Sequence, residues 1–223
     1  MRIATAAVMK RGVWAAALVL ALAFGANAQL INEVDSDQAG NDAGEFVELF
    51  GTPGTSLTGL VIVFFDGSSD LSYAAFDLDG FSLDANGFFV LGNSGVPGVD
   101  MTFSNNTLQN GADAVALYAA NGSNFPNGTA ITLTNLRDAL VYDTSDADDA
   151  GLLALLNASQ PQVDENGSGT GTAVSMSRCP DGAGGARNTT AYTLQAPTPN
   201  AANPCTVPVG QETWGKVKTY YRD

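Results

Sequence analysis

Short apolar runs separated by turn residues recur along most of this sequence, and they constrain the fold more than any other feature. The runs are rich in Val, Ile, Phe, Tyr and Leu and are bounded by Gly, Asn, Asp or Pro. Runs of about four to eight residues with such boundaries are typical of β-strands, and turn signals about every 8 to 12 residues are typical of a sandwich. The predicted fold class is therefore an all-β, antiparallel β-sandwich. Its strands are expected at 29–34, 45–50, 59–66, 87–92, 113–119, 138–143 and 172–177.

One segment, 148–156, has a helical pattern instead. Its leucines follow acidic residues that suit a helix N-terminus. The segment is too short to change the fold class. No repeat of fixed period is present, and the length of the chain suits one domain. We therefore expect a single sandwich domain over residues 29–205.

The first 28 residues have the pattern of a secretory signal peptide. Basic residues precede an apolar stretch at 13–24, and the sequence Ala-Asn-Ala at 26–28 matches an A-x-A cleavage site. The alternative is a transmembrane anchor, which needs about 20 apolar residues, whereas this stretch has 12. The longest later apolar run, 60–65, is shorter still. We expect cleavage before Gln29 and a secreted or cell-surface protein with no membrane span.

Cys179 and Cys205 are the only cysteines of the chain. An oxidising compartment favours a disulfide between them, and the bridge would close a segment rich in Gly and Pro. The alternative is two free thiols. Because the leader predicts export, we expect the disulfide.

The chain contains no histidine, and it is strongly acidic. Without histidine, Ser-His-Asp and Cys-His catalysis and His-ligated metal sites are excluded. The formal net charge is −14, and all 23 acidic residues follow position 28. Binding to nucleic acid relies on Lys and Arg that face the phosphates. We therefore expect no nucleic-acid partner.

Two acidic loops are candidates for binding calcium. Carboxylate and amide oxygens crowd the first loop, at 35–45, and a second cluster lies at 143–149. Calcium prefers oxygen ligands of this kind, but neither loop matches the twelve-residue EF-hand pattern. The alternative is that these residues are solvated turn residues. The candidate calcium ligands are Asp35, Asp37, Asp42, Asp146 and Asp148.

Glu48 is unusual within its predicted strand. Strand alternation places its side chain on the same face as Phe46 and Phe50. A carboxylate in such surroundings has a raised pKa and could act as a general acid, with Glu33 or Glu45 as the second carboxylate of a glycosidase-like pair. The alternative is a structural role in which Glu48 accepts backbone N–H bonds from a neighbouring loop. We favour the structural role.

The last segment, 206–223, differs from the rest in composition. It carries three of the six basic residues that follow position 28, together with aromatic residues. It is expected to be a docking or sorting peptide, a clip onto the acidic sandwich, or a frayed tail. The candidate docking residues are Trp214, Lys216, Lys218 and Arg222.

Several short motifs, in order along residues 30–203, together resemble the lamin tail domain family. The sequence INEV at 31–34 and GEFVELF at 44–50 are similar to that family's opening strands. Further similar pieces are LTGL at 57–60, LDANGFFVL at 83–91, LQNGADAVALY at 108–118, DALVY at 138–142, SMSR at 175–178 and TPN at 198–200.

This resemblance implies an immunoglobulin-like β-sandwich without an active site of its own. Bacterial members of the family occur on exported and cell-surface proteins, often beside nuclease or phosphatase domains. From this sequence we expect neither the coiled-coil rod that precedes the tail domain in animal lamins nor a companion catalytic domain.

The expected function is that of a non-enzymatic module for binding, adhesion or scaffolding, with a protein or polysaccharide of the cell envelope as partner. The second hypothesis is an accessory protein of a separately encoded secreted nuclease or phosphatase. The third is a hydrolase that uses Glu48 and Glu33. Apart from the candidate calcium, no cofactor is expected.

Overall fold

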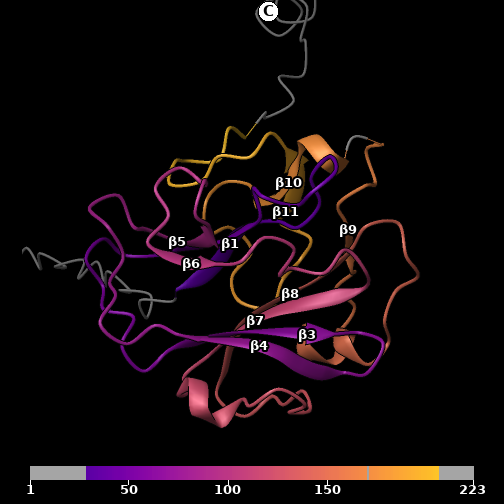
Figure 1. The fold of residues 1–223 in the computed structure, drawn as a ribbon, viewed down its shortest axis with the longest axis horizontal. Coiled ribbons are helices and arrows are strands. Elements are labelled where there is room, and N and C mark those ends of the chain that lie inside the picture. The colour runs from indigo at the N-terminus through magenta and orange to yellow at the C-terminus, as the bar shows by residue number, and fades with distance from the viewer. Residues whose placement is uncertain (1–28, 170, 206–223) are drawn as a thin grey trace, which may run out of the picture.

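Two β-sheets packed face to face form the fold in the computed structural model, which describes residues 29–169 and 171–205 (Figure 1). Eleven strands lie within these described residues. The six-stranded sheet has the order β11 (Tyr192–Gln195), β10 (Ser175–Arg178), β1 (Leu30–Asp35), β2 (Phe46–Phe50), β5 (Phe88–Asn93) and β6 (Met101–Phe103). The five-stranded sheet has the order β4 (Leu71–Asp77), β3 (Val61–Asp66), β7 (Asp113–Tyr118), β8 (Leu136–Asp143) and β9 (Val163–Asp164).

The all-β sandwich prediction is confirmed, with a correction to its strand directions. All seven predicted strands are present, as β1, β2, β3, β5, β7, β8 and β10. Both sheets are mixed rather than antiparallel, because β6 runs parallel to β5 and β9 runs parallel to β8. These parallel strands are the short edge strands of their sheets. They contain three and two residues, too few to show a period-2 pattern in the sequence.

The helical pattern at 148–156 corresponds to one short 3-10 helix, η2 (Leu152–Leu155). Its buried leucines pack against the outer face of the five-stranded sheet. Two further 3-10 helices, η1 (Gly122–Asn124) and η3 (Gly171–Ala173), lie in loops. Among the described residues, no helix has the length and apolar character needed to cross a membrane.

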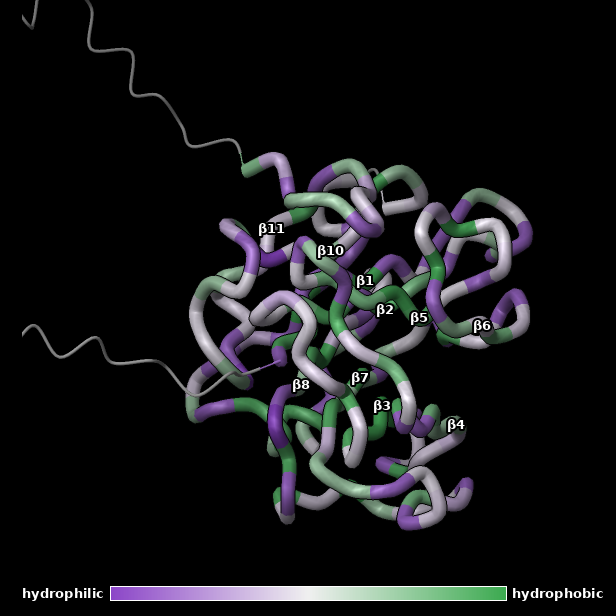
Figure 2. Tube along the Cα trace, turned by 90° about the vertical axis from the view of Figure 1, so that its left-hand side faces the viewer, coloured by the Kyte–Doolittle hydropathy of each residue, from purple (hydrophilic) through white to green (hydrophobic). Residues whose placement is uncertain are grey.

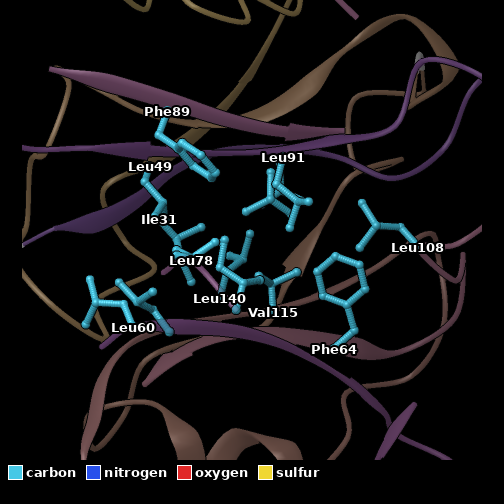
Figure 3. Close-up of a cluster of buried hydrophobic side chains, with 14 of the residues drawn as sticks. Ile31, Leu49, Leu60, Phe64, Leu78, Phe89, Leu91, Leu108, Val115 and Leu140 are labelled. Atoms are coloured by element: carbon cyan, nitrogen blue, oxygen red, sulfur yellow. The ribbon is translucent and has the colours of Figure 1, made fainter. Parts of the chain in front are cut away.

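The main core fills the space between the two sheets. Ile31, Leu49 and Phe89 reach into it from the six-stranded sheet, and Phe64 and Val115 reach into it from the opposite sheet (Figure 3). The hydropathy colouring shows the same arrangement, with apolar strands inside and polar loops at the periphery (Figure 2). Burial of these side chains, at about 25 cal/mol per Å² of apolar surface, is the main stabilising contribution to the fold.

A second core covers the outer face of the five-stranded sheet. Val61, Val63 and Phe65 point into it, opposite to their neighbours Ile62 and Phe64 in the main core. Both faces of β3 are therefore buried. This explains why β3 is an unbroken apolar run rather than an alternating one.

The C-terminal part of the described chain lies along the six-stranded sheet and is fastened to it. We call residues 198–205 the C-terminal strap. Cys205, at its end, forms the predicted disulfide with Cys179, which directly follows β10. Asn203 donates from its backbone N–H to Asp181 at 3.1 Å and from its side chain to the carbonyl of Arg178 at 2.9 Å. The disulfide and these bonds hold the strap against β10.

Removal of the disulfide should destabilise the protein. The bridge joins residues 26 positions apart, and in the chain-entropy model a loop of this size contributes about 3 kcal/mol. We expect the Cys179→Ala/Cys205→Ala variant to lose about this much free energy of unfolding in urea titration. The wild-type protein reduced with dithiothreitol, which loses the bridge without a change of residue, separates this loss from local repacking. An unchanged unfolding midpoint in the double alanine variant would contradict the prediction.

Candidate functional site

Two glutamates lie opposite each other on the outer face of the six-stranded sheet. Glu33 on β1 pairs in register with Glu48 on β2. Both side chains are fully buried. Val47 and Leu49, the neighbours of Glu48, point into the main core, whereas Phe46 packs with a separate outer cluster. The face predicted for Glu48 is thus confirmed, and that face is the outer side of the sheet.

The C-terminal strap supplies hydrogen bonds to this glutamate pair. The backbone N–H of Asn200 donates to Glu48 at 2.7 Å, and the backbone N–H of Thr198 donates to Glu33 at 2.8 Å. Asn32 donates to Glu48 at 2.9 Å, and the Ser175 hydroxyl donates to Glu33. The structural alternative for Glu48, acceptance of backbone N–H bonds from a neighbouring loop, is confirmed.

Burial shifts the pKa of both glutamates. Loss of solvent raises the pKa of Glu48 to about 8; the hydrogen bond from Asn32 opposes this shift, and the charge of Glu33 adds to it. The pKa of Glu33 is also raised by burial and is lowered in part by its bonds from Ser175 and Thr198. Like charges directly opposite on neighbouring strands are destabilising. The pair is therefore tolerated because donors surround it and because the raised pKa of Glu48 favours the neutral form of that carboxyl.

A buried ion pair lies next to the strap. Arg178 donates from Nη2 to Asp138 at 3.0 Å, and both side chains are fully buried. Its Nε donates to the carbonyl of Ile31 at 2.7 Å, and its guanidinium carbon lies 4.7 Å from the centre of the Tyr192 ring. Asp138 also accepts backbone N–H bonds from Ile31, at 2.9 Å, and from Arg187, at 2.5 Å. This group connects β1, β8, β10 and β11.

In the first predicted calcium loop, amide groups of the protein itself donate hydrogen bonds to the candidate carboxylate ligands. Gln38 donates to Asp35 at 2.6 Å and, from its backbone N–H, to Asp42 at 2.9 Å. The Asn110 side chain donates to Asp37 at 3.3 Å and to Asp42 at 3.1 Å. Over 29–169 and 171–205, no three His, Cys, Asp or Glu residues are grouped so that they could hold a metal ion. Calcium binding at this loop stays a prediction.

The second predicted calcium loop contributes to a cleft at the same end of the sandwich. Thr144, in this loop, donates to the carbonyl of Asn110, which connects the two acidic loops. Asp146 and Asp149 line the cleft, whereas Asp148 is exposed outside its lining. The cleft has a volume of about 330 Å³. Of the sequence candidates, the structure therefore brings Asp146 to the cleft and leaves Asp148 in solvent.

Two further aspartates of this cleft were not predicted. Asp66 ends β3 and Asp113 begins β7, and the two residues are paired in register. The predicted strands do end at these positions, but a strand pairing across 47 residues cannot be read from one sequence. The sequence alone groups only the acidic residues of 143–149, because these lie close together along the chain.

Comparison of the chain with protein-family models, with curated proteins and with solved structures finds no match. The resemblance to lamin tail domains therefore rests on this chain's own motifs. The predicted signal peptide (1–28) and the candidate docking residues Trp214, Lys216, Lys218 and Arg222 lie outside the described residues.

Proposed function

We propose that this chain is an exported, non-enzymatic binding or scaffold module of the lamin-tail type, with a partner in the cell envelope. The main observation in support is the buried position of the two carboxylates that are best suited to hydrolysis. Glu33 and Glu48 are fully buried, and both are bonded by the strap. A glycosidase pair must reach a substrate and a water molecule, whereas this pair joins the last described segment to the sheet.

Two further observations support the proposal. The disulfide is typical of proteins in oxidising compartments. The pieces that resemble lamin tail domains fall largely on strands that form the two sheets, including β1, β2, β5, β7 and β10. An immunoglobulin-like sandwich with an envelope partner is consistent with both.

The hydrolase hypothesis is tested with Glu48→Gln. We expect the purified protein to cleave neither a glycan panel nor phosphodiester substrates, and Glu48→Gln to remain folded. Asp79→Asn, which removes one exposed negative charge outside the strap, serves as the control. Cleavage that a folded Glu48→Gln variant loses and Asp79→Asn retains would overturn the non-enzymatic function.

The binding role itself is tested on isolated envelopes of the source cells. We expect labelled protein to bind them saturably, and excess unlabelled protein to displace it. Binding that is neither saturable nor displaceable would contradict a module function.

A further inference from the structure

The two pairs of facing carboxylates in this fold differ in one respect. Around Glu33 and Glu48, backbone and side-chain donors bond the carboxylates. Asp66 and Asp113 also face each other across neighbouring strands, and Asp66 accepts hydrogen bonds from Ser68 and Ser69. Asp113 is only 2% exposed, and its Oδ1 accepts the backbone N–H of Gly67 at 3.1 Å. Its Oδ2 is buried and accepts no hydrogen bond of ordinary geometry, although the nearby hydroxyl of Tyr73 lowers the pKa of the carboxyl in part.

A buried carboxylate oxygen without a donor is unfavourable, because the solvent that it loses is not replaced. Burial raises the pKa of Asp113 to about 7, and the charges of Asp66 and Asp149 add to this shift. The backbone N–H of Gly67 and the hydroxyl of Tyr73 oppose it. Asp70 is close to Asp149, and the charges of Asp149 and Asp66 raise its pKa as well. The charges of Asp66 and Asp149 thus act on both Asp70 and Asp113, and an added cation would relieve this repulsion.

The backbone holds the cleft wall in place. Gly67 donates to the carbonyl of Ala112 at 3.1 Å. A Cβ atom at position 67 would lie 2.0 Å from that oxygen, so only glycine allows the β3 end to approach the start of β7 this closely. Asp66 and Asp113 therefore lie at two strand ends that pack closely against each other.

No cation of the described chain neutralises this charge. Residues 29–205 contain no lysine and only three arginines. Arg178 is paired with Asp138, which is the only ion pair within the described ranges. Arg187 donates to the carbonyls of Leu155 and Leu156, and Arg137 is exposed at the start of β8.

The shape of the cleft distinguishes between kinds of cation. Calcium needs six to eight oxygens about 2.3–2.6 Å from one point, and no group of three acidic residues among those described provides such a point. The carboxylates instead line the walls of a cleft of about 330 Å³. An ammonium or guanidinium group carries several N–H donors that can reach separate carboxylates.

We infer that the cleft lined by Asp66, Asp113, Asp146 and Asp149 binds an ammonium or guanidinium group, as carried by a Lys or Arg side chain. Asp113 supplies the buried acceptor at the base, and exposed Asp146 lies at the mouth. This inference rests on the proposed binding function and names the chemistry of its ligand.

The test is titration of the isotope-labelled full chain with n-butylammonium and n-butylguanidinium chloride, followed by amide NMR shifts. We expect saturable shifts at Gly67, Ser68, Gly111 and Ala112, and none with sodium chloride at equal ionic strength. Asp113→Asn should weaken the affinity about tenfold, the size expected for one charged hydrogen bond. Asp146→Asn should weaken the affinity as well, and because Asp146 is exposed, this change is not expected to affect folding. Asp79→Asn, beyond the opposite end of β4, should bind as the wild type does.

Three outcomes would overturn the inference: no saturable shifts, equal shifts with sodium chloride, or unchanged affinity in both cleft variants. Calcium chloride that saturates the same amides at lower concentration than either organic cation would also overturn it, in favour of a metal. Each of these results would leave the proposed binding function standing, because that function is tested by envelope binding and by catalysis.

The same titration identifies the source of the cation. The variant Lys216→Gln/Lys218→Gln/Arg222→Gln removes the cationic side chains of the last segment. If this variant binds the probe more tightly, and its cleft amides are already shifted before the probe is added, the chain's own last segment fills the cleft. Unchanged affinity, with unshifted cleft amides, would exclude the last segment and leave a Lys or Arg side chain of another protein as the ligand. The cationic chemistry itself is decided by the titration with the two probes.

Discussion

The protein should be more stable near pH 5 than near pH 8. Burial raises the pKa of Asp35 to about 7, of Glu48 to about 8 and of Glu165 to about 9. Asp113 is raised to about 7 in the same way. These carboxyls bind protons more tightly in the folded chain than in the unfolded chain. Their contribution is therefore complete below the unfolded pKa values, near 4, and is lost as the pH rises through about 7 to 9.

The expected effect is large for a single domain. A tenfold difference in proton affinity corresponds to about 1.4 kcal/mol. If solvent relaxation leaves only one such tenfold difference still to be lost between pH 5 and pH 9 at each of the four carboxyls, the loss over this range is about 5 kcal/mol. Urea titrations at intervals of one pH unit measure this directly.

Matched variants identify the groups responsible for the pH dependence. Glu48→Gln and Glu165→Gln should each flatten the pH dependence and raise the unfolding free energy at pH 8 to 9. Asp79→Asn, on the exposed surface, should leave the slope unchanged. Stability that rises from pH 5 to pH 8 would refute the prediction, because it would require carboxyls whose pKa is lowered by folding.

The second large effect is expected at the buried ion pair. In Arg178→Met, Asp138 keeps its burial and loses its cationic partner, a situation that costs about 3–5 kcal/mol. The same change leaves the carbonyls of Ala183, Gly185 and Asn188 without the donor they now share. A domain stable by about 5–15 kcal/mol would be close to unfolding.

Two controls accompany Arg178→Met in the urea titration. Arg137→Met removes an exposed arginine from the same region and should change the free energy of unfolding by no more than about 0.5 kcal/mol. Arg178→Met/Asp138→Asn also removes the unpaired charge and should recover part of the loss. Unfolding of Arg178→Met at the wild-type urea concentration would show that the ion pair does not stabilise the connection of β1, β8, β10 and β11.

The sequence was informative wherever burial alone sets the pattern. The seven strands that carry the core were predicted because their apolar runs are continuous or alternate clearly, as in 61–65. β4 was missed because its half-buried residues mix Ser, Tyr and Ala, which give a weak period. β6 and β9 were missed because two or three residues form no pattern.

The candidate site was predicted in its parts, but the arrangement of those parts was not. The role of Glu48 as an acceptor of backbone N–H bonds followed from strand alternation, which is a local property. The donors Thr198 and Asn200 come from more than 150 residues away. The facing of Asp66 and Asp113 depends on strand register, which one sequence leaves open.

The central place of β1 has a consequence for how this chain reaches its folded state. β1 lies between β2 and β10, and Glu33 is bonded to residues 142 and 165 positions further along. Contacts over such separations form slowly, because a long loop must close first. The six-stranded sheet therefore stays incomplete until the end of the domain has been synthesised. If the chain is exported as proposed, this order would let translocation finish before the six-stranded sheet and the disulfide close.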